Sequence, residues 1–118
     1  MADTNKLGSW GESAALRFLK KLGYSEVARG YRTRFGEIDI IARNKGYLVF
    51  VEVKYRKSVD NTGAYEAVDI RKQKRICGVA RWYLLEKHIG ENAKCRFDVV
   101  GIQGDEIRVF ENAFDYIR

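Results

Sequence analysis

The chain has 118 residues, of which 46% are hydrophobic and 32% are charged, and its formal net charge is +6. This length fits one domain, residues 1–118, and the composition excludes a disordered or membrane-embedded chain. A basic protein favours polyanionic partners such as nucleic acid, and the lack of a long apolar run or apolar leader predicts a cytoplasmic protein with no membrane partner.

Hydrophobic periodicity and turn residues divide the chain into seven elements. In chain order, we expect a helix at 8–22, strands at 24–34, 37–43 and 47–55, a helix at 69–88, and strands at 95–102 and 107–110. Asp69 is placed to cap the second helix, and the polar segment 56–67 is expected to be the longest loop. The order α-β-β-β-α-β-β predicts an α/β fold with a mixed central sheet flanked by helices.

The hairpin between the second and third strands sets acidic residues against each other. If Lys45 and Gly46 form a two-residue turn, the numbers of facing residues sum to 91. Asp39 then meets Glu52, and two carboxylates whose Cβ atoms are about 5 Å apart repel each other. Ile41–Phe50 and Glu37–Lys54 face each other on the same side as this pair, and Ile38–Val53, Ile40–Val51 and Ala42–Val49 form a wholly apolar face on the other.

A divalent cation would turn this repulsion into attraction. Asp39 and Glu52, with a backbone carbonyl such as that of Val53 and with water, form the hard-oxygen set that Mg²⁺ or Mn²⁺ prefers. Lys54 points to the same face as Glu52 and is suited to hold a phosphate oxygen or the attacking water. The structural alternative is a Glu37–Lys54 salt bridge, with both acids at exposed strand ends.

The scarcity of cysteine and histidine limits other chemistry. Cys77 and Cys95 are the only cysteines and form no CxxC motif, so we expect buried apolar residues rather than zinc ligands. His88 is the only histidine and falls near the expected end of a helix, where it is a poor base for a Ser-His-Asp or Cys-His mechanism. Catalysis would therefore depend on carboxylates, lysine and a metal.

Five blocks of the sequence resemble a known family. They are WGESAALRFLKKLGY, RFGEIDIIAR, FVEVKYRKS, EAVDIRKQKRI and RFDVV. Together they are similar to a bacterial family of small uncharacterised proteins that are predicted endonucleases of the PD-(D/E)XK superfamily, related to archaeal Holliday-junction resolvases. The resemblance implies a restriction-endonuclease-like α-β-β-β-α-β core. It also implies that Asp39 is the metal-binding aspartate, Glu52 the second acid and Lys54 the lysine of the motif.

The resemblance adds Glu12 and Gln73 to the catalytic set, and Ile38 stands where the superfamily usually has proline. Glu12 lies on the inward face of the first helix, where a carboxylate needs a partner, but the helix dipole alone also favours an acid in a first turn. Gln73 lies on an apolar stripe between Ile70 and Cys77, either within it or as a polar residue at its edge.

Basic residues cluster around the strands and the helix that would carry the site. Those expected to hold phosphates are Arg32, Arg34, Arg56, Lys57, Arg71, Lys72, Lys74 and Arg75. Phosphate contacts supply affinity without sequence information. For each of them, a solvated surface is the alternative.

Three aromatic residues and one further acid are assigned structural roles. Trp10, Trp82 and Tyr83 are expected on helix-packing surfaces rather than on base-stacking platforms. Asp98 is expected to be a structural acid paired with an arginine such as Arg96.

These observations predict a metal-dependent endonuclease that hydrolyses DNA phosphodiester bonds and uses Mg²⁺ or Mn²⁺. Branched or junction DNA is the expected substrate because no helix-turn-helix or zinc finger is evident, and junction cleavage would require a homodimer. One alternative is a non-catalytic nucleic-acid-binding adaptor in DNA repair or uptake, although such a protein has no use for opposed acids. Another is a ribonuclease, which shares the same chemistry.

Overall fold

The computed structural model describes residues 4–56, 69–90 and 92–116. Its elements are α1 (Thr4–Lys21), β1 (Ser25–Thr33), β2 (Gly36–Asn44), β3 (Tyr47–Arg56), α2 (Ile70–Glu86), β4 (Cys95–Gln103) and β5 (Glu106–Phe114). The strands form one sheet in the order β1-β2-β3-β4-β5, in which β3 and β4 are parallel and all other neighbours are antiparallel. The fold is therefore mixed α/β, and the predicted element order is confirmed.

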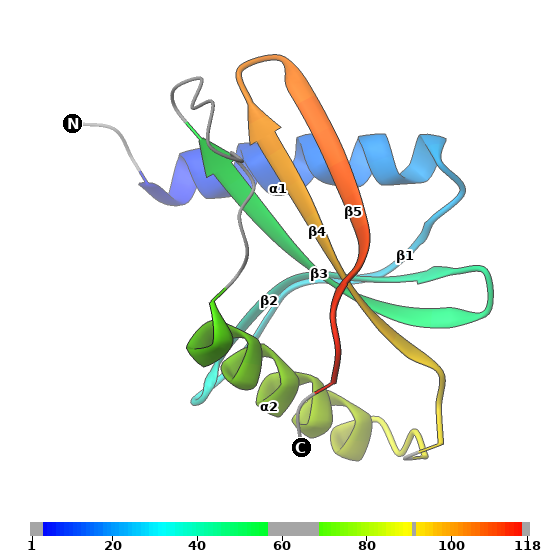
Figure 1. Ribbon diagram of the computed structural model, residues 1–118. Helices are drawn as coiled ribbons and strands as arrows, with labels where there is room; N and C mark the ends of the chain where they lie inside the picture. The colour runs from blue at the N-terminus through cyan, green and yellow to red at the C-terminus, as the bar shows by residue number, and fades with distance from the viewer. Residues whose placement is uncertain (1–3, 57–68, 91, 117–118) are drawn as a thin grey trace.

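The two helices cover opposite faces of the twisted sheet (Figure 1). Beneath α1, Ala15 and Leu19 pack on the buried residues Ile40, Val49 and Val51 in one apolar core. A second core lies beneath α2, which crosses over between β3 and β4 and supplies Ile76, Cys77, Val79, Ala80, Tyr83 and Leu84. Because both faces of the central strands are covered, β3 and β4 read as nearly continuous apolar runs. Cys77 is buried, as expected, whereas Cys95, also expected to be buried, is only partly so.

The second helix begins where its cap residue predicts, but its apolar stripe begins later. The Asp69 carboxylate accepts a hydrogen bond from the Lys72 backbone N at 2.9 Å. Ile70, expected on the buried stripe, is 59% exposed, and the buried residues of α2 begin only at Ile76, so that assignment was wrong. The expected loop at 56–67 lies, apart from Arg56, outside the described residues.

The last strand is longer than expected, running to Phe114 instead of ending at Phe110. Its extension pairs with β4 beyond a register shift between Phe97 and Val99, and Phe97 faces Phe114 across it. Long-range pairing of this kind overrides the local sequence pattern. Neither of the helices in the described ranges is long and apolar enough to cross a membrane.

A polar network is buried where α1, β2 and β4 meet. Arg96 Nε donates to Asp98 Oδ1 at 2.9 Å, and Arg96 Nη2 donates to Asn44 Oδ1 at 2.8 Å. Tyr24 donates its hydroxyl hydrogen to Asp98 Oδ2 at 2.7 Å, and burial together with this bond raises the pKa of Tyr24. Asp98 is fully buried, and the predicted Asp98–Arg96 pair is confirmed.

Gly36, the first residue of β2, occupies a position that suits only glycine. Its φ is +151°, and an added Cβ would lie 3.0 Å from Cγ of Arg75 on α2. We expect Gly36→Ala to lower the free energy of unfolding by about 1–3 kcal/mol. The control is Gly78→Ala within α2, where an added Cβ meets no atom within 4 Å. There the better helix propensity of alanine should raise stability by about 0.5–1 kcal/mol. Urea denaturation measures both, and equal stability of Gly36→Ala and wild type would contradict the strain at this position.

Candidate functional site

The register of the β2–β3 hairpin is the expected one near the turn. Lys45 and Gly46 both have positive φ, 52° and 82°, as the favoured two-residue hairpin turn requires. Residues 40–44 pair with 47–51, and their numbers sum to 91 as predicted. The ladder then ends, so the expected backbone pairs beyond it were wrong; these are Ile38–Val53, Asp39–Glu52 and Glu37–Lys54.

The ladder ends because the Asp39 side chain occupies the gap between the strands. Asp39 Oδ2 accepts a hydrogen bond from the backbone N of Val53 at 2.7 Å, in place of a strand carbonyl. Strict alternation along β2 also breaks here. Ile38 packs in the core beneath α2, whereas Ile40 packs in the core beneath α1, so the two do not share the face that the sequence predicted.

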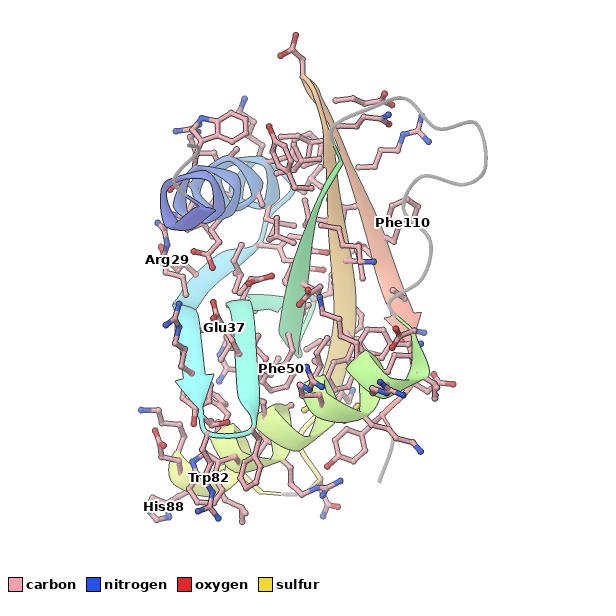
Figure 2. All side chains as sticks on the ribbon, turned by 90° about the vertical axis from the view of Figure 1, so that its left-hand side faces the viewer. Arg29, Glu37, Phe50, Trp82, His88 and Phe110 are labelled. Carbon is pink, nitrogen blue, oxygen red and sulfur yellow. The ribbon has the colours of Figure 1, made fainter. Side chains whose placement is uncertain are left out.

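Glu12, Glu37 and Asp39 form an acidic cluster. One carboxylate oxygen of each residue lies within 4.8 Å of the other two. α1 places Glu12 over the sheet, and the preceding residue, Gly11, faces β3, where an added Cβ would make an ordinary contact 3.9 Å from the Tyr55 ring. In Figure 2, Glu37 lies on the α1 side of β2. The structure thus brings Glu12 and Asp39 together and adds Glu37.

Burial and the repulsion of neighbouring carboxylates raise the pKa values of Asp39 and Glu12. The pKa of Asp39 rises from 3.8 to about 7, chiefly through burial and next through the negative charge of Glu52. Glu12 and Glu37 raise it further, while the hydrogen bond from Val53 lowers it. Burial and the charge of Glu37 likewise raise the pKa of Glu12. Added positive charge would therefore be favourable at this point.

Glu52 approaches Asp39 from the other face of the sheet. It pairs with Val99, which packs in the core beneath α2, and it is only 8% exposed. Its Oε1 atom lies 2.6 Å from Nζ of Lys72, a residue expected to bind nucleic acid. The negative charges of carboxylates on both faces of the sheet therefore repel the Asp39 carboxylate, although Glu52 and Asp39 are not paired in the β2–β3 ladder.

The remaining predicted site residues are neighbours in the sequence of Glu52 or of its partner Lys72. Lys54 is two residues further along β3, on the same face, and is partly buried. Gln73 lies in the first turn of α2, next to Lys72, and is also partly buried. Val53 contributes its backbone N to Asp39.

The basic residues expected to hold phosphates lie on β1, in the β1–β2 turn, at the end of β3 and on α2. On β1, Arg32 is used within the site, since its Nε lies 3.0 Å from Glu37 Oε2. Arg34 lies in the β1–β2 turn, over the Phe35 ring. The exposed basic residues of α2 are Arg71, Lys72, Lys74 and Arg75. The Arg56 side chain and the whole of Lys57 lie outside the described part of the structure.

Sequence reasoning missed the roles of Glu37 and Arg29. Arg29 donates to Ser13 Oγ at 2.7 Å, and its charge opposes the rise in the pKa of Glu12 (Figure 2). Glu37 had a usable signal, because residues two apart on a strand share a face and Glu37 is two residues before Asp39. Arg29 had none, because its position depends on the β1–β2 register, where it faces Ile40.

The aromatic assignments were only partly correct. Tyr83, a residue of α2, is buried in the core between this helix and the sheet, as expected for a packing residue. Trp10 and Trp82 are 49% and 46% exposed, so both present much of the indole ring to solvent. Each contacts another exposed aromatic ring: Trp10 meets Tyr55, and Trp82 meets Phe35.

Comparisons with known proteins identify the family of this chain and several of its relatives. A family model described as uncharacterised protein family UPF0102 matches residues 11–102. A UPF0102 protein of Lachnoclostridium phytofermentans is 52% identical over 104 residues, covering 88% of each chain. One of Desulfosudis oleivorans is 48% identical over 111 residues, covering 92% of this chain and 89% of the relative.

The similarity to one solved structure is weaker than the similarity to these relatives. The crystal structure of SSO0001 superimposes with a TM-score of 0.49 and 21% sequence identity. The match covers 98% of this chain and 55% of that one, so this chain spans about half the length of SSO0001.

Proposed function

The chain belongs to the UPF0102 family of uncharacterised proteins, and from this premise we propose that it is a metal-dependent endonuclease acting on DNA. The proposal combines the sequence blocks that resemble the PD-(D/E)XK superfamily with the arrangement of acids around Asp39. It includes a restriction-endonuclease-like fold, for which the α-β-β-β-α-β order is support.

The observation that carries the proposal is the acidic cluster. Three carboxylate oxygens lie within 4.8 Å of one another, and the charge of Glu52 acts on the same aspartate. Such a group of like charges is unfavourable unless protons or cations neutralise it. Carboxylate oxygens are the donors that Mg²⁺ and Mn²⁺ prefer, so the residues present fit a divalent cation.

In the proposed mechanism, Asp39 and Glu52 hold the cation with the help of the Val53 carbonyl, and Glu12 supports them. When bound, the cation supplies positive charge to the scissile phosphate and to the attacking water. Lys54 orients that water or steadies the developing negative charge on the phosphate.

Residues around this centre adjust its charge and position. Gln73 supports the site from the first turn of α2. Lys72 neutralises Glu52 in the metal-free protein through a 2.6 Å contact, and its partly exposed side chain would be free to contact a phosphate if a cation neutralised Glu52 instead.

The proposed substrate is branched or junction DNA, and the exposed basic residues of α2 and of the β1–β2 turn supply its phosphate contacts. Cleavage of two strands at a junction requires two sites, which a homodimer would provide.

Cleavage of labelled linear, flapped and four-way-junction DNA, and of RNA, with Mg²⁺ or Mn²⁺ tests the proposal. We expect wild type to cut DNA, Asp39→Ala and Lys54→Ala to lose that activity, and Glu106→Ala to keep it. Glu106 is a matched control because it is an exposed acid on β5, paired with Arg108. Cutting that survives both site substitutions would contradict the assignment. Binding without cutting by wild type would favour the adaptor, and cutting of RNA alone would favour a ribonuclease.

A further inference from the structure

Phe35 and Trp82 form an exposed aromatic pair, termed here the aromatic platform. Phe35 lies in the β1–β2 turn and is 49% exposed, and Trp82 lies on α2 and is 46% exposed. Their ring centroids are 6.1 Å apart and the rings meet at 60°. Two large rings thus remain half in solvent while touching each other. Aromatic surface of this kind is costly to expose and is useful for binding flat apolar groups.

The platform is held in place by the structure around it. The backbone N of Phe35 donates to Thr33 Oγ1 at 3.0 Å, which fixes the turn. The next residue, Gly36, lies against the side chain of Arg75, so the turn rests on α2. Because the rings are already positioned, ordering them would cost little of the free energy of ligand binding.

Positive charge borders the platform. The guanidinium carbon of Arg34 lies 5.0 Å from the centroid of the Phe35 ring, within the range of a cation–π interaction. A second arginine, Arg75 of α2, lies against Gly36, the residue that follows Phe35 in the chain. Aromatic rings flanked by arginines match a ligand that is itself a flat ring attached to phosphates, namely a nucleotide in a nucleic-acid strand.

We propose that the aromatic platform stacks an unpaired base of single-stranded DNA. An unpaired base is required because both faces of a base inside a duplex are already covered by its neighbours. The proposal rests on the proposed function for its choice of DNA, and it deepens that function by naming a structural feature of the substrate.

The platform lies close to the acidic cluster along the chain. Phe35 is two residues before Glu37, which is at most about 7 Å of extended backbone. A strand whose scissile phosphate lies at the cluster would therefore place an unpaired base on the platform within a few nucleotides. This arrangement selects DNA in which single-stranded and double-stranded segments meet.

Fluorescence of Trp82 tests the platform without any cleavage. The chain has two tryptophans, so Trp10→Phe leaves Trp82 as the only one. We expect dT12 added in EDTA to quench this fluorescence to saturation. In the full-length protein, Phe35→Ala and Trp82→Ala should each weaken dT12 binding by about 5- to 150-fold, the range for loss of one stacked base. Phe35→Tyr should restore binding, and binding of a blunt duplex should not change.

Phe110→Ala is the matched control, because Phe110 is another exposed aromatic residue and lies on β5, far from Trp82 in Figure 2. Absence of quenching, or equal weakening by Phe110→Ala, would overturn the platform. Tenfold tighter binding of U12 than of dT12 would overturn the choice of DNA. The binding assay contains no metal, so a negative result would overturn the platform without bearing on cleavage. In the same way, a protein that does not cut DNA could still bind dT12 at the platform.

Discussion

Asp39→Asn is expected to stabilise the metal-free protein at pH 8 by on the order of 3 kcal/mol. Asparagine has nearly the shape of aspartate and can still accept the hydrogen bond from Val53 N, but it carries no charge. The pKa of Asp39 rises from 3.8 to about 7 because of burial and the neighbouring carboxylates. Its ionisation therefore costs folding free energy, and the asparagine variant avoids this cost.

The same pKa shift fixes the sign of the pH dependence. The folded protein keeps the Asp39 proton up to about pH 7, whereas the unfolded chain releases it near 3.8. Between these values the folded state binds more protons, so the contribution of Asp39 to stability is fully present below about pH 4 and is lost as the pH rises through about 7. The stability difference between Asp39→Asn and wild type should grow over the same interval.

Urea denaturation in EDTA at pH 5, 6, 7 and 8 measures this difference. Asp105→Asn, at an exposed position in the β4–β5 turn, is the control and should follow wild type at every pH. Added Mn²⁺ should stabilise wild type and not Asp39→Asn. An asparagine variant that is less stable than wild type at pH 8 would contradict the electrostatic account of the acidic cluster.

Asp98→Ala is expected to lower the free energy of unfolding by about 3–5 kcal/mol, because it leaves a buried guanidinium without its carboxylate. Arg96 is only 7% exposed and donates to both oxygens of Asp98. The Tyr24 hydroxyl and the Asn112 backbone N also donate to Asp98 and would lose their acceptor. The loss therefore reaches four donor groups on three residues, which lie in three separate parts of the chain.

Chemical denaturation of Asp98→Ala, compared with Glu106→Ala, measures this loss. The Glu106–Arg108 pair is exposed, with side chains 54% and 60% accessible, and its removal should cost no more than about 1 kcal/mol. Equal, small losses for both variants would show that the buried network contributes no more than a surface ion pair.

The element order and most of the hairpin register could be predicted because both depend on local signals. Helical and strand periodicity place the elements, and the positive φ values that Lys45 and Gly46 adopt set the register for residues 40–44 and 47–51. The Arg96–Asp98 pair could also be predicted, because residues two apart on a strand share a face.

The geometry at Asp39 could not be predicted, because it depends on contacts between distant parts of the chain. A side chain that replaces a ladder carbonyl leaves no trace in sequence periodicity. Ile70 and Trp82 are 59% and 46% exposed, whereas the buried residues of α2 run from Ile76 to Leu84, and the helical pattern alone did not separate these positions. The acidic residues themselves were identified, but their placement on the two faces of the sheet required the structure.

Isothermal titration of Mn²⁺ into wild type and Asp39→Asn tests most directly whether this group of acids is a metal centre. We predict a saturable heat for wild type, with protons released near pH 7 as the cation displaces them, and no such heat for Asp39→Asn. Identical titrations for the two proteins, or no binding by wild type, would contradict the account.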